Sequence, residues 1–229
     1  MRPAVKRRPY DNSRRAALVR ATRADVVAAA QRLFVARGYT ATTIEAIADE
    51  AAVPLGTVYR LFESKRGILL AVLDVVFGGD DEQVAYRDRP ATRAALAHED
   101  PNRLLEAFAP LTRELLERSA PVLQVLRSAA ETDQDAVELY AEARRQQYDG
   151  RSNVARLLAR RGQLAVSERE AADILFTLMS PEVFLILTRE RGWSAEQYER
   201  WLTQAMQATL LGALRETVAE GKRRRPRDS

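Results

Sequence analysis

Apolar residues recur three or four positions apart along nearly the whole of this 229-residue chain, which is the spacing of one face of an α-helix. Alternation of apolar and polar residues between turn signals, which would indicate strands, is missing from the sequence. The first clear helix is predicted from Thr22 to Arg37, with Gly38 as its C-cap. Another is predicted to start near Ser64 and to run through Phe77. The pattern therefore predicts an all-α protein.

Residues 42–62, between these two helices, show the pattern of two short helices joined by a tight turn. Thr42 followed by Glu45 is a capping-box signal for the first of them. Pro54 suits the start of the second, because the N–H that proline lacks would be unpaired there. The apolar residues of the pair form two facing stripes: Ile44, Ile47, Ala48, Val58, Leu61 and Phe62. This layout is typical of a helix-turn-helix.

The second helix of this pair has an outward face that differs from an ordinary solvated one. It holds apolar, hydroxyl and cationic side chains: Leu55, Thr57, Tyr59 and Arg60. A face that only confers solubility would carry mainly Glu and Lys. Base edges and phosphates can use the mixture found here, so the pattern indicates a helix that reads DNA.

The rest of the chain is also predicted to be helical, with breaks at turn residues. Residues 90–100 are polar and are predicted to form a loop. Pro121 is predicted to open a new helix. Asp133 or Asp135 is expected to cap a long helix that ends at Gly162.

Charge is divided unevenly along the chain. Residues 1–66 carry 13 Lys and Arg against 6 Asp and Glu, a net +7, whereas residues 67–221 carry 18 against 25, a net −7. The last eight residues, 222–229, add +4. A basic head on an acidic body is the electrostatic pattern of a nucleic-acid reader whose second part has another task.

The sequence offers little for catalysis. Without cysteine there is no disulfide, no thiol chemistry and no cysteine metal site. The single histidine, His98, lies in a polar stretch and is expected at the surface. No glycine-rich phosphate loop follows a strand. We therefore expect no enzyme activity, no cofactor and no metal.

No membrane or export segment is expected either. The sequence has no run of 18 or more apolar residues, and its basic N-terminus is not followed by an apolar segment of the kind found in secretory signals. The expected location is the cytoplasm, and no membrane partner is expected.

A family resemblance rests on the same region. The stretch Gly38–Ile44 (GYTATTI), then Ile47-Ala48, then residues 52–59 (AVPLGTVY), then Phe62 and Lys65, resembles at fixed spacing the DNA-binding domain of TetR-type repressors. Two positions depart from the usual pattern. Ala52 stands where the family mostly has glycine, in a turn that tends to need a positive φ. Pro54 stands where a serine cap is usual.

The resemblance implies an all-α fold with an N-terminal three-helix bundle that contains the helix-turn-helix, followed by a C-terminal helical domain for ligand binding and dimerisation. The expected division is a basic disordered arm at 1–21, the DNA-binding domain at 22–66, the helical domain at 67–221 and a basic tail at 222–229. The implied partners are double-stranded operator DNA, a small-molecule inducer and a second copy of the chain.

The predicted DNA contacts divide between phosphates and bases. The predicted phosphate contacts are Thr42 and Thr43 at the start of the first helix, then Tyr59 and Lys65. The predicted base-facing residues are Leu55, Gly56, Thr57 and Arg60. Gly56 would allow a close approach, and Arg60 is the best candidate for reading a guanine.

The resemblance also implies a small-molecule pocket within the helical body. The candidates to line it are Phe77, Phe108, Tyr140, Gln147, Tyr148, Phe176 and Met179. Most of these are expected to be ordinary core, with two or three at a cavity, and Arg144 could supply a polar contact. The net −7 of the body favours a cationic or neutral inducer over an anionic one.

The last two helices carry the prediction of a dimer. Residues 174–187 are apolar on nearly every side, with Pro181 expected to bend the helix, and Ser194 is expected to cap the next one. In TetR-like proteins these helices pair with their symmetry mates as a four-helix bundle. The predicted interface is Ile174, Leu178, Leu185, Tyr198, Trp201, Leu202 and Met206. The alternative is that these residues are simply core.

The sequence therefore predicts a ligand-responsive TetR-type repressor that binds palindromic operator DNA as a dimer and is released by a small-molecule inducer. Two alternatives remain. One is a DNA-binding dimer without inducer control. The other is a helical small-molecule-binding or catalytic protein whose head no longer reads DNA.

Overall fold

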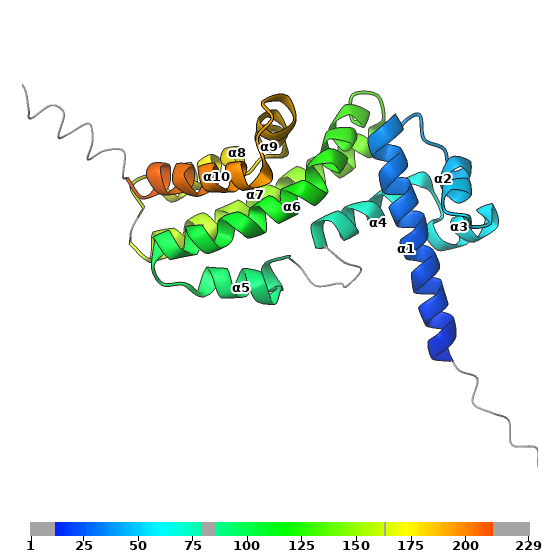
Figure 1. Cartoon of the computed structure of the whole chain (residues 1–229), viewed down its shortest axis with the longest axis horizontal. Helices are drawn as coiled ribbons and strands as arrows, with labels where there is room; N and C mark the ends of the chain where they lie inside the picture. Colours follow the sequence, from blue (N-terminus) through cyan, green and yellow to red (C-terminus); the bar gives the residue numbers. More distant parts are fainter. Residues whose placement is uncertain (1–11, 79–85, 163, 213–229) are drawn as a thin grey trace, which may run out of the picture. The chain divides into compact units, whose positions relative to one another are not determined.

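The computed structural model describes residues 12–78, 86–162 and 164–212 (Figure 1). Every element in these ranges is helical, which confirms the all-α prediction. The chain divides into two compact units, Met1–Val72 and Leu73–Ser229, with the division inside helix α4. The predicted arm over residues 1–11 and the predicted tail at 222–229 lie outside the described residues.

The first unit consists of four helices: α1 (Asn12–Arg37), α2 (Ile44–Glu50), α3 (Leu55–Phe62) and the start of α4 (Lys65–Gly78). Apolar residues from all four are buried together, because each helix presents one apolar stripe that is stable only when it is covered. The main contributors are Val26, Ala30, Phe34, Ile47, Val58, Phe62, Ile68 and Leu69. Gly38 ends α1 at φ +83°, as predicted for a C-cap.

Helix α1 begins at Asn12 rather than at Thr22, so the prediction of a disordered arm is wrong for residues 12–21. This segment is rich in Ala, Leu and Arg, which are strong helix formers. Residues 15–21 are exposed, including Leu18 and Val19. The segment therefore extends a helix whose later turns are anchored in the core, and intrinsic propensity is enough to continue it.

The turn between α2 and α3 places Ala52 at φ +53°. This is the left-handed region that the resemblance indicated and that alanine adopts only at a cost, because its Cβ meets the backbone. Ala52 is exposed, so its methyl group contributes little packing. The strain is therefore not offset locally.

Replacing Ala52 with glycine is expected to raise the free energy of unfolding by about 1 kcal/mol, because the strain disappears. The neighbouring Ala51 has ordinary helical angles, φ −82° and ψ −8°, and is the matched control. Ala51→Gly should lower the same quantity by about 0.5–1 kcal/mol. Chemical denaturation of the two variants measures both changes. A lower free energy of unfolding in Ala52→Gly would contradict the claim that Ala52 is strained.

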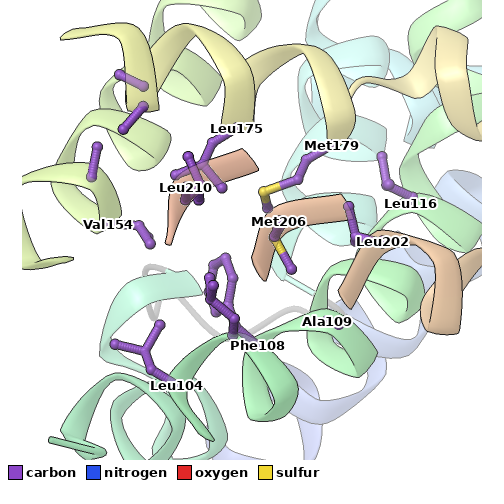
Figure 2. Close-up of a cluster of buried hydrophobic side chains, with 14 of the residues drawn as sticks. Leu104, Phe108, Ala109, Leu116, Val154, Leu175, Met179, Leu202, Met206 and Leu210 are labelled. Carbon is purple, nitrogen blue, oxygen red and sulfur yellow. The ribbon is translucent and has the colours of Figure 1, made fainter. Parts of the chain in front are cut away.

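The second unit is built around two long helices, α6 (Pro101–Ala129) and α7 (Gln134–Arg160), which pack against each other (Figure 1). The other elements are α5 (Pro90–Ala97), α8 (Glu168–Leu178), α9 (Pro181–Leu185), α10 (Ala195–Leu210) and the short turns Tyr86–Asp88 and Ile186–Glu190. Helix α6 contacts α5, α7, α9 and α10, and α8 contacts both α7 and α10. The core of this unit therefore lies where α6, α7, α8 and α10 meet (Figure 2).

Two predictions for the middle of the chain are wrong. Residues 90–97 form helix α5 rather than a loop, because Pro90 occupies the first turn, where it is tolerated, and four alanines follow. Pro121 does not open a helix, because α6 continues through both Pro110 and Pro121. The buried face of α6 runs unbroken across Pro121, from Leu115 to Leu126, and this packing offsets the lost hydrogen bond.

Caps fix the ends of the later helices. Asp133 accepts from the backbone N–H of Ala136 at 3.0 Å, which confirms it as the N-cap of α7. Ser194 and Gln197 form a capping box at the start of α10, as the serine signal predicted. The expected bend at Pro181 is instead a break: α8 ends at Leu178, and Ser180 caps a new helix in which Pro181 is the first residue.

The stretch Glu168–Glu190 is, by length and composition alone, apolar enough to cross a membrane. This differs from the expectation that the chain holds no such segment. A single segment of this kind is weak evidence for a span, because core helices pass the same test. Here Leu175, Met179 and Phe184 lie in the core of the second unit, so the stretch is accounted for by packing inside the helical body.

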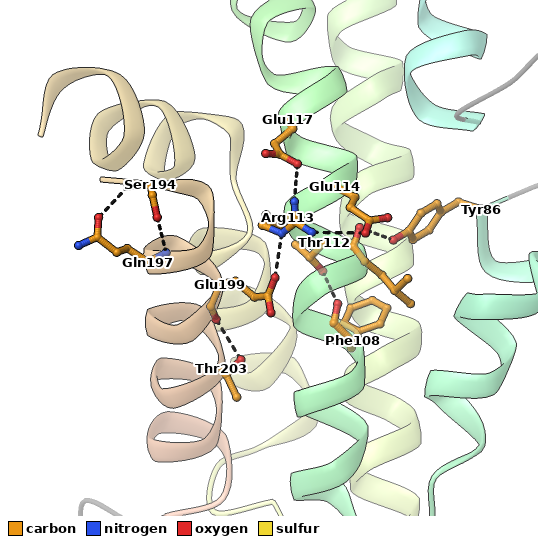
Figure 3. A network of polar contacts seen from close by, with 11 residues as sticks. Tyr86, Phe108, Thr112, Arg113, Glu114, Glu117, Ser194, Gln197, Glu199 and Thr203 are labelled. Carbon is orange, nitrogen blue, oxygen red and sulfur yellow. Dashed lines mark hydrogen bonds and ion pairs between the residues drawn. The ribbon is translucent and has the colours of Figure 1, made fainter. Parts of the chain in front are cut away.

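One arginine links α6 to α10 (Figure 3). Arg113 Nε donates to Glu199 at 2.8 Å, and its terminal nitrogens reach Glu117 at 2.6 Å and Glu114 at 3.4 Å. The hydrogen bond that Arg113 donates to Glu199 is the main cause that raises the pKa of Arg113. This network fixes the start of α10 against the middle of α6.

Candidate DNA-binding site

The start of the helix-turn-helix uses two adjacent threonines for different purposes. Thr43 is the N-cap of α2, and its hydroxyl accepts from the N–H of Ala46 at 3.2 Å. Thr42 is fully buried, and its hydroxyl donates to the carbonyl oxygen of Gly38 at 2.7 Å. The prediction that Thr42 caps the helix and contacts a phosphate is therefore wrong. Thr43 is exposed at the position where a phosphate contact was predicted.

Helix α3 brings the predicted reading residues onto one exposed side. Leu55 and Tyr59, one turn apart, are 38% and 44% exposed. Gly56 and Arg60 form a second exposed pair beside them. Thr57 is half-buried, and its hydroxyl accepts from the Arg60 guanidinium at 3.4 Å. The helix thus presents an apolar group, a phenol and a cation together, next to a glycine.

The N-terminus of α3 is open. Pro54 is its N-cap and provides no side-chain hydrogen bond. The first backbone N–H groups of the helix therefore point outward without a side-chain acceptor, which is the arrangement that binds phosphate. A Cβ added at Gly56 would meet no atom within 4 Å, so space for close approach exists here.

The C-terminus of α3 is held by residues that the sequence did not suggest. Arg23 of α1 donates to the carbonyl oxygen of Leu61 at 3.1 Å, and its guanidinium lies 4.5 Å from the centre of the Phe62 ring. Gly67 of α4 lies against the same end, because a Cβ there would be 2.0 Å from the carbonyl oxygen of Phe62. Of these residues, only Gly67 could have been noticed in the sequence, because a glycine near the start of a predicted helix is unusual.

Lys65 was predicted to contact a phosphate, but the structure places its side chain against the protein's own backbone. Its ammonium donates to three backbone carbonyls, those of Tyr39 at 3.1 Å, Thr42 at 3.2 Å and Thr40 at 3.5 Å. It also lies 4.4 Å from the centre of the Tyr39 ring. All three ammonium protons are used, so in this structure Lys65 holds the turn before α2 instead of facing outward.

The second unit contains a cavity of about 210 Å³ between α6, α7 and α9. Its lining consists of Leu123, Gln124, Arg127, Tyr140, Arg144, Gln147, Pro181, Glu182, Leu185, Ile186 and Glu190. Two of the predicted pocket residues, Tyr140 and Gln147, are among them, and so is Arg144. The turn Ile186–Glu190 at one side is a π-helical turn, an irregularity common at functional sites.

The other predicted pocket residues lie elsewhere. Phe108 and Met179 are buried in the core of the second unit. Tyr148 and Phe176 pack edge to face, with ring centres 5.4 Å apart. Phe77 is half-buried on α4. None of these five residues lines the cavity. Helical spacing identifies an inward face, but it does not show whether that face meets other side chains or an open space.

Several predicted interface residues belong to the core of a single chain. Tyr198, Leu202 and Met206 are fully buried there, and Leu185 lines the cavity. For these four residues the interface prediction is wrong, because α6 and α8 already cover the stripe of α10 that carries three of them. The remaining three, Ile174, Leu178 and Trp201, are half-buried and keep part of their apolar surface exposed.

Comparisons with known proteins agree with this geometry. Residues 26–72 match the family of bacterial regulatory proteins, tetR family. The structure of NalD, the secondary repressor of the MexAB-OprM multidrug efflux pump in Pseudomonas aeruginosa, is 23% identical, with a TM-score of 0.64 over 85% of this chain and 98% of that one. The SmeT–triclosan complex is 18% identical, with a TM-score of 0.66 over 84% of this chain and 93% of that one.

At these identities the two structures show a shared fold. No curated protein sequence matches the chain significantly. The family match covers the helix-turn-helix with the exposed side of α3, and the shared fold extends over the helical body. Residues 26–72 therefore belong to the tetR family of bacterial regulatory proteins, and the chain as a whole shares its fold with NalD and SmeT.

Proposed function

We propose that the protein is a homodimeric, cytoplasmic repressor whose affinity for a palindromic operator falls when a small molecule occupies the cavity in the second unit. The observation that carries this proposal is the exposed side of α3, where Leu55, Gly56, Tyr59 and Arg60 are presented on a helix whose C-terminal end is held by Arg23. A helix in a major groove needs such a mixture of groups on a rigid support.

The proposed contacts follow from exposure. Thr43, Tyr59 and the first N–H groups of α3 contact phosphates, which position the protein on the duplex. Leu55, Gly56, Thr57 and Arg60 face the bases, and Arg60 donates to a guanine in the major groove. Thr42 is left out because it is buried, and Lys65 because its protons are used. Lys65 instead supports the site by holding the turn before α2.

The proposed dimer uses the half-buried apolar residues of α8 and α10. Ile174 and Leu178 lie one turn apart on α8, and Trp201 and Ala205 lie one turn apart on α10, which packs against α8. A two-fold axis through these helices would cover both pairs. It would also provide two reading helices, which must be spaced about 34–36 Å apart to meet successive major grooves.

The cavity supports ligand control because four apolar residues of its lining lie beside polar and charged side chains that can orient a ligand. SmeT, which shares this fold, forms a complex with triclosan. A ligand that favours a conformation with different spacing of the two reading helices lowers operator affinity, and by linkage operator DNA lowers ligand affinity equally. The π-helical turn contributes Ile186 and Glu190 to the lining, so such a ligand would contact it.

The dimer is tested by placing a charge on the proposed interface. Ile174→Glu is expected to give folded monomers whose operator affinity falls at least about 100-fold, because a single head makes only half of the contacts. Val137→Glu is the matched control, since Val137 is an apolar residue 39% exposed on α7. It should remain a dimer with normal affinity.

Sedimentation and a gel shift with the DNA that flanks the gene are the measurements. Leu202→Glu tests whether Leu202 lies in the core of one chain or in the dimer interface. A charge in the core should unfold the second unit, whereas a charge in the interface should release folded monomers. A wild-type protein that sediments as a 25.7 kDa monomer at micromolar concentration would falsify the dimer.

A further inference from the structure

Arg151 is a half-buried residue of α7 whose guanidinium has no acidic partner among the described residues. Its Nε is buried and has no hydrogen-bond partner. The groups that perturb its pKa electrostatically are Tyr86, Tyr198 and Arg144, and no carboxylate of the described residues is among them. Burial lowers the pKa of Arg151 to about 10. The protein therefore holds the positive charge of Arg151 in surroundings where burial disfavours the charged form.

The two tyrosines beside Arg151 do not neutralise it. Tyr86 donates its hydroxyl proton to the carbonyl oxygen of Leu111 at 2.8 Å, and Tyr198 donates to that of Leu178 at 3.0 Å. Burial raises the pKa of Tyr86 to about 12 and raises that of Tyr198 further. Both phenols are therefore neutral near pH 7 and offer Arg151 only oxygen lone pairs.

Arg118 strengthens the local positive charge. It lies on α6, and it acts with Arg151 on Tyr86, where both cations lower the pKa that burial raises. The Nε of Arg118 is also buried without a hydrogen-bond partner. The neighbouring carboxylate of Glu114, which also acts on Tyr86, is half-exposed and pairs with Arg113 at 3.4 Å. Two guanidinium groups thus flank Tyr86 with incomplete pairing.

The cavity begins one helical turn from Arg151. Gln147, only 6% exposed, lines the cavity, and Arg151 follows it at i+4 on the same face of α7. The cavity lining itself holds two cations and two carboxylates: Arg127 and Arg144 lie 3.3 Å and 3.7 Å from Glu182, and Glu190 is the second acidic residue of the lining. Arg151 is therefore the nearest cation on this face that remains without an acidic partner among the described residues.

We propose that the ligand of this regulator is a compact organic acid whose carboxylate pairs with Arg151, while its apolar part lies against Leu123, Leu185 and Ile186 in the cavity. This rests on the proposed ligand control. A buried cation that gains a carboxylate partner forms charge-assisted hydrogen bonds, and their attraction offsets part of the cost of burying the charge. The cavity volume of about 210 Å³ lies below the ~300–1,000 Å³ of sites for drug-sized ligands, which favours a small acid.

This ligand class differs from the cationic or neutral inducer that the net charge of residues 67–221 favoured. Net charge is carried mostly by exposed side chains, which solvent screens from the interior. The charge that a buried ligand meets is set by the groups in contact with it. Here that group is a guanidinium.

The test compares acids with their neutral amides. Hexanoate, octanoate and benzoate are titrated against hexanamide, octanamide and benzamide, and the midpoint of thermal unfolding of the full chain is followed. At about 100-fold excess over Kd, at least one acid is expected to raise Tm by about 5–10 °C, and its amide by clearly less. If every acid and its amide give the same shift, including no shift, the proposal is wrong.

Variants locate the effect. Arg151→Gln should weaken the responsive acid by about 10–100-fold and remove the difference between acid and amide. Arg145→Gln is the matched control on the same helix, because Arg145 is 67% exposed and pairs with Glu142. It should respond as the wild type does. An acid preference that survives in Arg151→Gln overturns the assignment.

The thermal stability of the free protein tests the state of Arg151 in a second, independent way. Arg151→Leu removes the uncompensated charge, so it should raise Tm of the free protein. A fall in Tm would show that Arg151 stabilises the fold through partners of its own, and this would also overturn the proposal.

Operator binding, followed in the same titrations, separates this proposal from the proposed function. Acids that bind through Arg151 without releasing DNA would contradict ligand control and leave the acid site intact. Neutral compounds that release DNA equally from the wild type and from Arg151→Gln would contradict the acid site and leave ligand control intact.

Discussion

Raising the salt concentration from 50 to 200 mM is expected to weaken operator binding by about 10³–10⁵-fold. Two heads of a dimer would neutralise on the order of 6–10 phosphates, and each neutralised phosphate releases condensed counterions. The net +7 of residues 1–66, against −7 over 67–221, concentrates the attraction at the end of the chain that carries α3. Fluorescence anisotropy over a salt series gives the slope of log K against log salt.

A truncated variant serves as the control for this slope. Removing residues 1–11 removes Arg2, Lys6, Arg7 and Arg8 and leaves α1 to α3 complete. The slope should become shallower, whereas the preference for the operator over random DNA should persist. A slope near zero in the full chain contradicts the phosphate contacts, and a loss of preference on truncation would assign base reading to the N-terminal residues.

Gly67→Ala is expected to lower the free energy of unfolding by about 3 kcal/mol and to abolish operator binding. An added Cβ would lie 2.0 Å from the carbonyl oxygen of Phe62, which is backbone and cannot rotate away. The start of α4 and the end of α3 must therefore move apart. This movement would also disturb the contact of Arg23 with Leu61, and the reading face would lose its support.

Gly56→Ala is the matched control for Gly67→Ala. Gly56 lies in α3, and a Cβ there meets nothing within 4 Å. Alanine should therefore raise the free energy of unfolding by about 0.5–1 kcal/mol through its higher helix propensity. Denaturation curves and operator affinities of the two variants are compared. Equal stabilities in the two would show that the close approach at Gly67 does not constrain the fold.

The helix-turn-helix was predictable because its determinants are local. Caps, a turn and two facing stripes occupy residues 42–62, and each signal depends on neighbours a few positions away. The error at Thr42 has the same origin, since two adjacent threonines are both suitable caps and only packing against Gly38 distinguishes them. The role of Lys65 depends on a turn 23–26 residues earlier, which no local pattern records.

The sequence predicted that residues 67–221 are helical, but it did not predict which apolar residues lie in the core, at the cavity or at the surface. Periodicity shows that α10 has an apolar stripe, but the covering element must be known before Leu202 is assigned to a core or to an interface. The same limit applies to the cavity, where aromatic content suggested Phe108 and Phe176 and the structure shows neither at the lining. Arg151 could not be recognised from the sequence, because only the structure shows that it has no acidic partner among the described residues.

The reading of bases by α3 is tested most directly by selecting binding sites from a random DNA library with the wild type and with Arg60→Ala. The wild type should select a palindrome whose half-sites are centred about one helical turn apart, with a guanine required in each. Arg60→Ala should select the same palindrome with that guanine relaxed and with affinity lower by about 1–3 kcal/mol. Identical selected sites for both proteins, or no selected site for the wild type, would contradict the claim that α3 reads bases through Arg60.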